Sequence, residues 1–361
     1  MRVLIVTGSS GGHIFPAVAL AEELEKMNTD LLLVLPQKTP EEKLPVAAYN
    51  LRYIPAGFLS FNLSRKSIYG FLCFLGGAWE SLRLILKFKP DVVVGFGSLN
   101  TLAVVFWAWL FRIKTIIHEQ NVVCGKANRL LSKLVDRVAV SFSQTRVNLN
   151  IRDAKIVLTG NPLRRDLVRI ERIAALDFFN FQPGKFTILI TGGSQGSHRL
   201  NSVCFETLSN YQAKHNLQVI HICGAPDFSY LEDKYSSLNL SYKLFEFFKQ
   251  MEYAYSVADL IICRSGATTI AELVKFKVPA ILVPYPFAYD HQLANARVLS
   301  NQGCGEIILD NNLSADSVGE KLQGYFAHPE RLTKMAQGYQ NMPDVFAARL
   351  LANAVISLNN V

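Results

Sequence analysis

The sequence is poor in cysteine and in long apolar runs, and each shortage excludes a class of protein. Its six cysteines are widely scattered and form no Cys-x-x-Cys pair. That spacing argues against a structural zinc site or a disulfide framework and fits a reducing compartment. The longest uncharged apolar stretch, Leu102–Phe111, is too short to span a bilayer, and no secretory signal is recognisable. We therefore expect a soluble cytoplasmic protein that still has contact with membranes.

Two common nucleotide-binding signatures are also missing. The glycine loops at residues 8–12 and 192–196 both fail to match the Gly-x-Gly-x-x-Gly dinucleotide fingerprint, and the sequence has no Gly-Lys-Ser/Thr phosphate loop. Neither a Rossmann dehydrogenase nor a P-loop nucleotidase is therefore indicated.

Positive charge is concentrated in the first part of the chain. Residues 1–160 carry 19 Lys and Arg against 11 Asp and Glu, whereas residues 161–361 carry 18 of each, so the net charge of +8 comes from the first part. A basic surface attracts anionic lipid, nucleic acid or a phosphorylated substrate. A solvated basic surface without any partner is the alternative.

Both parts of the chain begin with the same pattern. The apolar runs 3–6 and 187–190 lead directly into glycine loops and then into helical segments such as 17–27, and later apolar runs again meet loops of small residues. Continuous Val/Ile/Leu runs indicate strands buried on both faces, and their alternation with helices indicates βαβ units. We predict an α/β fold of two doubly wound, Rossmann-like domains that face each other across a cleft. The first covers 1–160 and the second begins at 161, because Pro162 disfavours helix there.

The glycine loops are candidate binding sites. A loop between a parallel strand and a helix brings backbone N–H groups and the positive helix end to one point, which suits a phosphate. A single loop of this kind is often purely structural. Four of them, two in each part of the chain, favour a binding function.

Six sequence blocks together resemble the MurG family of glycosyltransferases, which transfer N-acetylglucosamine (GlcNAc) from UDP-GlcNAc to lipid I in bacterial peptidoglycan synthesis. The blocks are Ser10-Gly11-Gly12-His13 with Pro16, His118-Glu119-Gln120-Asn121, Gly160-Asn161-Pro162-Leu163-Arg164, Gly192-Gly193-Ser194-Gln195-Gly196, Arg264-Ser265-Gly266-Ala267-Thr268-Thr269 with Glu272, and Asp290-His291-Gln292 with Asn295-Ala296. They keep the family's order and spacing over nearly the whole chain.

The resemblance implies a GT-B fold with an acceptor-binding, membrane-facing domain at 1–160 and a UDP-sugar-binding domain at 161–340. It also implies a C-terminal helix at 341–361 that packs back on the first domain. The implied reaction is an inverting transfer to the C4 hydroxyl of the muramyl sugar of a polyprenyl-diphosphate-linked muramyl-peptide acceptor. No cofactor and no nucleic acid take part, and the enzyme works at the cytoplasmic face of the cell membrane.

Two loops depart from the family pattern. Ser9 replaces the second glycine of Gly-Gly-x-Gly-Gly-His, while Ser98 and Leu99 stand where Gly-x-Gly-Gly-Tyr ends in glycine and tyrosine. Both departures lie in the acceptor-binding part. The blocks implied to bind the donor keep the family pattern, and the two changed loops belong to the part implied to bind the acceptor.

Most donor residues are implied by the resemblance, and local chemistry agrees. Ser194 is expected at a helix N-terminus, where it would contact the diphosphate. Arg164 has a planar guanidinium that suits phosphate oxygens, and an ion pair with Asp166 is its alternative role. Glu272 suits the ribose hydroxyls, although it could be an ordinary surface glutamate. The resemblance also implies that the backbone of Phe248 contacts uracil and that the side-chain amides of Asn121 and Gln292 bind the sugar. The other implied substrate-binding residues are Ala267, Thr268 and Thr269 of the small-residue loop, and Ser10, Gly11 and Gly12 of the first loop.

Catalysis needs a base for the attacking hydroxyl and stabilisation of the departing UDP. His13 is the best candidate base, because it closes the first glycine loop and titrates near neutrality; shaping the acceptor pocket is its alternative role. Glu119, oriented by His118, is the second candidate. No Asp-x-Asp motif is present, so the reaction does not require a bound metal.

An uncharged segment, Ser67–Trp79, follows the apolar run 58–63 and precedes several Lys and Arg. It has a stripe at helical spacing: Ile68, Phe71, Leu72, Leu75, Trp79 and Leu82. We expect this stripe to face the core, and the off-stripe Tyr69 and Phe74 to dock shallowly on an anionic membrane surface.

Two other functions stay open at this point. A UDP-GlcNAc epimerase or a glycolipid synthase could use the same architecture, and a nucleotide-sugar sensor could bind without turnover. An epimerase would need no acceptor site and gives no reason for the basic, aromatic first part.

Overall fold

The computed structural model describes residues 1–37, 39, 49–57, 64–211, 216–287, 290–342 and 346–359, so the apolar run 58–63 lies outside the described residues. The chain divides into two compact units. The first comprises Met1–Arg165 with Val345–Val361, and the second comprises Asp166–Asp344. Each unit is built on its own sheet.

The first unit contains a parallel sheet in the order β3-β2-β1-β4-β5-β6-β7. Its strands are β1 (Arg2–Val6), β2 (Asp30–Pro36), β3 (Leu51–Ile54), β4 (Val92–Gly95), β5 (Lys114–Glu119), β6 (Arg137–Val140) and β7 (Ile156–Leu158). Its helices are α1 (Gly11–Glu25), α2 (Arg65–Phe88), α3 (Leu99–Leu110), α4 (Lys126–Leu131) and α13 (Ala347–Asn359). The apolar β1 lies between β2 and β4, and its side chains Val3 and Ile5 are buried in one cluster with residues of α1 and α13.

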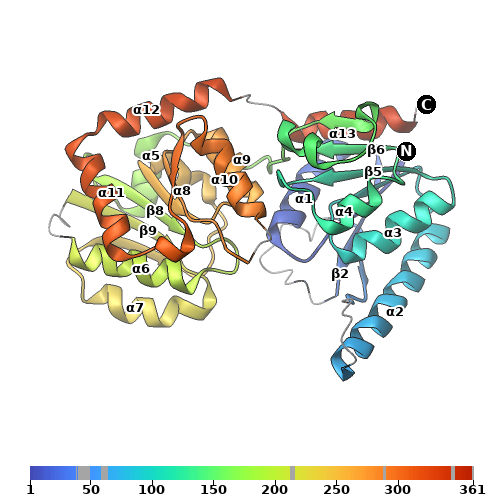
Figure 1. Cartoon of the computed structure of the whole chain (residues 1–361), viewed down its shortest axis with the longest axis horizontal. Helices are drawn as coiled ribbons and strands as arrows, with labels where there is room; N and C mark the ends of the chain where they lie inside the picture. Colours follow the sequence, from blue (N-terminus) through green and yellow to red (C-terminus); the bar gives the residue numbers. More distant parts are fainter. Residues whose placement is uncertain are drawn as a thin grey trace. The chain divides into compact units, whose positions relative to one another are not determined.

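The last helix of the chain belongs to this first core. Leu351, Val355 and Leu358 of α13 are buried in one cluster with Ala17 and Leu20 of α1. Figure 1 shows α13, in red, beside the strands of the first unit. An apolar face at helical spacing therefore connects the C-terminus to the first unit.

The second unit repeats the plan with a parallel sheet in the order β10-β9-β8-β11-β12-β13. Its strands are β8 (Phe186–Thr191), β9 (Leu217–Ile222), β10 (Ser241–Phe245), β11 (Leu260–Cys263), β12 (Ala280–Leu282) and β13 (Gly305–Ile307). Its helices are α5 (Arg172–Phe179), α6 (His198–Asn210), α7 (Phe228–Ser236), α8 (Met251–Val257), α9 (Ala267–Phe276), α10 (His291–Ser300), α11 (Ala315–Ala327) and α12 (Glu330–Gly338). The prediction of two doubly wound α/β domains is confirmed.

The packing of α2 differs from expectation. The predicted core stripe is wrong, because Ile68, Phe71, Leu72, Leu75 and Trp79 are between 47% and 58% exposed. The buried face carries small residues instead, namely Ser67, Gly70, Gly77 and Ser81, followed by Leu84 and Ile85.

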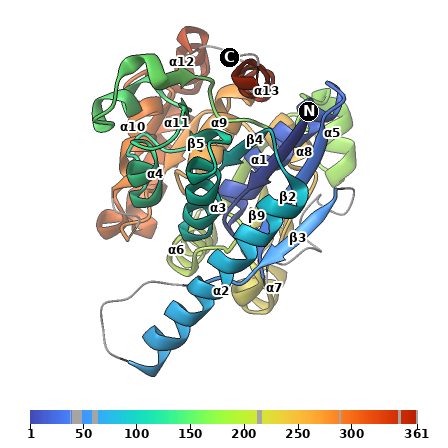
Figure 2. The ribbon, with the colours of Figure 1, turned by 90° about the vertical axis from the view of Figure 1, so that its right-hand side faces the viewer.

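Small side chains explain this orientation because they allow close approach of neighbouring backbone. A Cβ on Gly77 would lie only 2.6 Å from the carbonyl oxygen of Pro55. On the α3 side, the indole Nε1–H of Trp107 donates to the Ala78 carbonyl at 2.9 Å. The bulky side chains are left on the outside, and α2 extends past the rest of its unit (Figures 1 and 2).

Candidate active site

All four predicted small-residue loops, at residues 8–12, 95–98, 192–196 and 264–268, follow the strands at which the strand order reverses. In the first unit the reversal lies between β1 and β4, and in the second unit between β8 and β11. Open parallel sheets bind ligands at the carboxyl ends of the strands at such a switch point. Each sheet therefore places two small-residue loops where a ligand is expected.

The loop after β8 is a tight turn that delays the start of α6. Gly193 and Gly196 have φ of +86° and +76°, and a Cβ on Gly196 would lie 2.1 Å from the Cys223 carbonyl oxygen. Helix α6 consequently begins at His198 with Ser197 as its N-cap. The prediction that Ser194 stands at the helix N-terminus is wrong: Ser194 is exposed in the turn before it.

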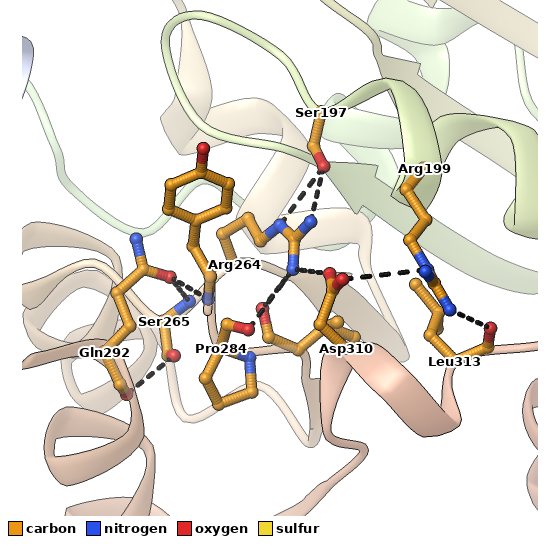
Figure 3. Close-up of polar contacts among 10 residues, drawn as sticks. Ser197, Arg199, Arg264, Ser265, Pro284, Gln292, Asp310 and Leu313 are labelled. Atoms are coloured by element: carbon orange, nitrogen blue, oxygen red, sulfur yellow. Dashed lines mark hydrogen bonds and ion pairs between the residues drawn. The ribbon is translucent and has the colours of Figure 1, made fainter. Parts of the chain in front are cut away.

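Arg264, at the end of β11, joins this loop to three other segments (Figure 3). It is 6% exposed, and its Nε and Nη2 donate to Ser197 Oγ at 3.1 and 2.8 Å. Its Nη1 donates to Asp310 Oδ1 at 2.6 Å and to the Pro284 carbonyl at 3.3 Å. A buried guanidinium thus fixes the cap of α6 relative to the segments after β11, β12 and β13.

Gln292 is held in one orientation by backbone groups. Its Oε1 accepts from the N–H groups of Ser265 and Tyr285, at 3.2 and 3.0 Å. The Ser265 hydroxyl donates to the Gln292 carbonyl at 2.8 Å (Figure 3). Because Oε1 accepts two hydrogen bonds from backbone N–H groups, the amide NH₂ of Gln292 points away from these groups and can donate to an oxygen-rich ligand.

Helix α9 carries the remaining donor candidates of the small-residue loop. It begins at Ala267 with Gly266 as N-cap, so Thr268 and Thr269 lie in its first turn, at the positive end of the helix dipole. On the same helix, Glu272 Oε2 accepts from the Tyr255 hydroxyl at 2.7 Å. This bond fixes the glutamate carboxylate one turn into α9.

Phe248 follows β10 and belongs to an aromatic cluster. Its side chain is 9% exposed and its ring lies 4.5 Å from Phe245 and 5.6 Å from Phe179 between centroids. Only its backbone is therefore a candidate for base recognition.

In the first unit, His13 is the third residue of α1, and its ring is fixed by the helix cap. Ser10 Oγ and His13 Nδ1 form a hydrogen bond at 2.8 Å. Burial lowers the pKa of His13, and the negative charge of Glu119 partly offsets this effect. A neutral imidazole at physiological pH can accept a proton, as a general base must. Ser10, Gly11 and Gly12 form the beginning of the same helix, with Ser10 as N-cap.

Glu119 ends β5 and anchors the loop that follows. Its Oε1 accepts from the Asn121 backbone N–H at 2.9 Å and from Asn121 Nδ2 at 3.3 Å. Its Oε2 accepts from the Gly125 N–H at 3.0 Å and from Asn128 Nδ2 at 2.9 Å. The residue is 1% exposed. Four N–H groups donate to the carboxylate, so both of its oxygens are engaged in holding the loop after β5.

His118 connects β5 to the end of the first unit. Its Nε2 lies 3.0 Å from the Gly160 carbonyl oxygen, and burial lowers its pKa to about 4. A neutral His118 therefore donates its Nε2 proton to that carbonyl. It fixes the segment leading to Arg164, whose guanidinium lies 4.9 Å over the ring of Phe15 in α1. Arg164 thus belongs to the first unit, together with His13 and Glu119.

The sequence reasoning missed three residues that hold the second-unit loops together. Ser197 and Arg264 lie within or beside recognised blocks, so their position in the sequence was a usable signal. Asp310 lies in no block, and only the fold brings it to Arg264.

Comparisons with known proteins agree with this architecture. The model of the glycosyltransferase family 28 N-terminal domain matches residues 3–140, and that of the family 28 C-terminal domain matches residues 187–350. A protein of Thermodesulfovibrio yellowstonii is 38% identical over 93% of this chain and 92% of its own length. A protein of Halothermothrix orenii is 35% identical over 98% of both chains. Both are named UDP-N-acetylglucosamine--N-acetylmuramyl-(pentapeptide) pyrophosphoryl-undecaprenol N-acetylglucosamine transferase.

Solved structures give the same picture at the level of the fold. The crystal structure of Acinetobacter baumannii MurG superposes with a TM-score of 0.75 and 26% identity over 99% of both chains. A UDP-GlcNAc 2-epimerase of Neisseria meningitidis, solved with UDP-GlcNAc, reaches a TM-score of 0.71 at 16% identity, over 99% of this chain and 100% of its own. At that identity the epimerase shows a shared fold alone.

Proposed function

The chain belongs to glycosyltransferase family 28, and from this premise we propose that it transfers GlcNAc from UDP-GlcNAc to the muramyl sugar of a polyprenyl-diphosphate-linked muramyl peptide. It is a glycosyltransferase of peptidoglycan synthesis, the step from lipid I to lipid II. The observation that carries this conclusion is the identity of 35–38% with transferases of this name over more than nine-tenths of the chain.

The second unit is the proposed donor site. In this proposal the amide NH₂ of Gln292, whose Oε1 is engaged by backbone N–H groups, donates to a sugar oxygen. The N-terminal ends of α6 and α9 bind the diphosphate. The carboxylate of Glu272, which accepts from the Tyr255 hydroxyl, is proposed to accept hydrogen bonds from the ribose hydroxyls as well. The assignments of Ser194, Phe248, Ala267, Thr268 and Thr269 rest on the family pattern.

The first unit supplies the proposed base. The C4 hydroxyl oxygen of the acceptor attacks the anomeric carbon of GlcNAc, and its proton passes to His13 Nε2, because Nδ1 is engaged by Ser10. The bond from the anomeric carbon to the β-phosphate oxygen breaks with inversion, and its electrons leave with UDP. Arg164 adds a positive charge that favours this leaving group.

Glu119 has a supporting role in this mechanism. Its carboxylate accepts four N–H bonds and raises the proton affinity of His13 through its charge. It also fixes Asn121, whose amide is assigned to substrate recognition by the family pattern. We infer that Glu119 positions Asn121 and acts on His13 through its charge, while His13 accepts the proton.

We also infer that the exposed face of α2 and α3 docks on an anionic membrane surface at the cytoplasmic side. Besides the α2 stripe, Phe106, Trp109, Leu110 and Phe111 of α3 and its end are at least 40% exposed. Arg83, Lys87 and Lys89, toward the C-terminal end of α2, are exposed as well. Such a pairing of apolar and cationic side chains suits the interface of an anionic bilayer.

Among the described residues one helix, Ser67–Phe88, is long and apolar enough to cross a membrane, with 28% of its most apolar window buried. Its small-residue face packs against the Pro55 carbonyl and α3. That packing favours a helix lying on the bilayer over one that spans it.

The test of the function is UDP release measured with and without the lipid-linked acceptor. We expect release only when the acceptor is present. The Glu272→Ala variant should weaken UDP binding measured by calorimetry, whereas alanine at the exposed Glu320 of α11 should not. Conversion of UDP-GlcNAc without acceptor would instead indicate an epimerase, and tight UDP-GlcNAc binding without any turnover would indicate a sensor.

A further inference from the structure

Ser98, one of the two residues that depart from the family loop, has a backbone conformation reserved for glycine. Its φ is +82° and its ψ is 165°. Lys89, Asn180 and Lys277 also have positive φ, but with ψ between 41° and 62° they adopt the left-handed helical conformation that commonly ends a helix. The region occupied by Ser98 is almost closed to residues with a Cβ. A serine there strains the backbone where glycine would not.

The hydroxyl of Ser98 adds a second cost. Ser98 is the N-cap of α3, yet its side chain makes no capping hydrogen bond. Its Oγ is buried and has no hydrogen-bond partner within the part of the chain that the structure describes. A buried hydroxyl without a partner destabilises the folded state. Serine at this position therefore does not serve the stability of the free protein.

Asn128 presents a second polar atom of the same kind. The residue is 2% exposed, and its Nδ2 donates to the His118 carbonyl at 3.0 Å and to Glu119 Oε2 at 2.9 Å. Those two bonds use both amide protons and so fix which atom is the oxygen. The remaining Oδ1 is buried and has no partner among the described residues.

Asn128 and the candidate base His13 both lie beside Gly97, the residue before Ser98. A Cβ on Gly97 would lie 3.5 Å from His13 Nε2 and 3.6 Å from Asn128 Oδ1. A Cβ on Gly8 would lie 2.9 Å from Ser98 Cβ and 3.0 Å from His13 Nδ1. The backbone of Gly97 therefore lies beside both the base and Asn128, and the missing side chain lets a ligand group approach it closely.

We propose that the Gly97–Ser98 turn and Asn128 form a subsite for a hydroxyl or N–H group of the acceptor sugar, beside the hydroxyl that His13 deprotonates; this rests on the function proposed above. A sugar hydroxyl both donates and accepts, so it can give its proton to Asn128 Oδ1 and receive one from Ser98 Oγ. Ser98 as a residue is only partly buried, and rotation about χ1 brings its hydroxyl to the ligand. A phosphate carries no proton for Asn128 Oδ1 and fits this subsite less well.

Two substitutions of Ser98 separate the effect of its hydroxyl from the effect of its strained backbone. Ser98→Ala removes the hydroxyl and keeps the strained backbone, whereas Ser98→Gly removes both. The matched control is Lys277→Gly, which relieves positive φ at an exposed position of the second unit and removes nothing from the subsite. The measurements are the KM for the lipid-linked acceptor, the KM for UDP-GlcNAc and the melting temperature.

We expect both Ser98 variants to raise the acceptor KM by about threefold to tenfold, as the loss of one uncharged hydrogen bond does, with the donor KM unchanged. Ser98→Gly and Lys277→Gly should melt at higher temperature, and Lys277→Gly should keep the wild-type acceptor KM. An unchanged acceptor KM in Ser98→Gly, with the higher melting temperature, would overturn the subsite.

Inhibition by a polyprenyl diphosphate without sugar identifies the contacted group. If Ser98→Ala weakens this inhibitor as much as it weakens the acceptor, the contact is with the diphosphate and the proposal is wrong. The proposed function fails separately, through a wild-type enzyme that releases no UDP with any lipid-linked acceptor.

Discussion

The guanidinium of Arg264 holds the hydroxyl of Ser197 with two N–H groups, at 2.8 and 3.1 Å, although 67 residues separate them in the chain. The contact joins the loop after β8 to the loop after β11 at the switch point of the second sheet. Asp310 accepts from the same guanidinium, so the positive charge is paired within the protein and not left for a ligand. Arg264 is therefore a residue that positions the loops.

Replacing Arg264 by lysine tests this role. A lysine keeps the positive charge, but its single ammonium group cannot replace the several N–H groups with which the planar guanidinium binds Ser197 and Asp310 together. We expect UDP affinity to fall severalfold in calorimetry and the free energy of unfolding to fall by about 2 kcal/mol. The control is Arg199→Lys, because Arg199 is half exposed and lies 3.7 Å from the same aspartate. Lower stability with unchanged UDP affinity would separate these loops from the donor site.

The role of His13 is tested by its pH dependence. Burial lowers the pKa of His13, so the base stays deprotonated to below the ordinary histidine value of about 6.5. We expect kcat at saturating substrates to be level around neutrality and to fall only at more acid pH. His13→Ala should lose about a hundredfold or more in kcat with unchanged UDP affinity.

A matched variant checks the positioning of the ring. Ser10→Ala removes the partner of His13 Nδ1 and should lower kcat less than His13→Ala does. A His13→Ala enzyme whose loss is confined to the acceptor KM would make His13 a binding residue. The base would then have to be sought elsewhere.

The sequence was sufficient for the architecture because apolar strands followed by glycine loops leave few other folds. The same blocks predicted that Gln292 and Glu272 stand at the ligand edge of the second sheet, where their helices begin beside β11 and β12. Asp310 could not be found in this way, since its importance comes from a contact across 46 residues with Arg264. The orientation of α2 was predicted wrongly because periodicity counts apolar bulk, whereas close packing selected the small residues Gly70, Gly77 and Ser81.

The buried His118 makes stability depend on pH. Its pKa is about 4 in the folded protein because of burial, and about 6.5 in an unfolded chain. The unfolded state thus binds a proton first as the pH falls, so stability is full above pH 6.5 and is lost between about 6.5 and 4. The loss from this residue is on the order of 3 kcal/mol.

The measurement is the melting temperature from pH 8 to pH 4. His118→Gln removes the titrating group and keeps an N–H donor for the Gly160 carbonyl, so we expect a shallower decline. Another buried histidine, His221, whose pKa is lowered to about 3, still contributes to the slope. An unchanged profile in His118→Gln would mean that His118 is not the source of this part of the acid instability.

The last prediction concerns the exposed face of α2. Trp79 is 57% exposed, and its ring centroid lies 5.3 Å from the Arg83 guanidinium. Phe74 is half-buried, and its backbone lies close to Gly57. If the face docks on a bilayer, Trp79→Ser should reduce binding to anionic vesicles by roughly tenfold, because an apolar side chain no longer leaves water. Its melting temperature should stay near that of the wild type. Phe74→Ser should instead lower the melting temperature.

Charge and control variants complete this experiment. Binding should weaken as salt rises, because each nearby Lys or Arg contributes about 1 kcal/mol and is screened. Vesicles of neutral lipid should bind weakly. Val147→Ser changes an apolar side chain of the same unit that is 90% exposed and lies outside α2 and α3, so it should leave vesicle binding unchanged. If Trp79→Ser and Val147→Ser bind vesicles equally well, the face of α2 does not carry the membrane contact, and the lipid-linked acceptor reaches the enzyme by another surface.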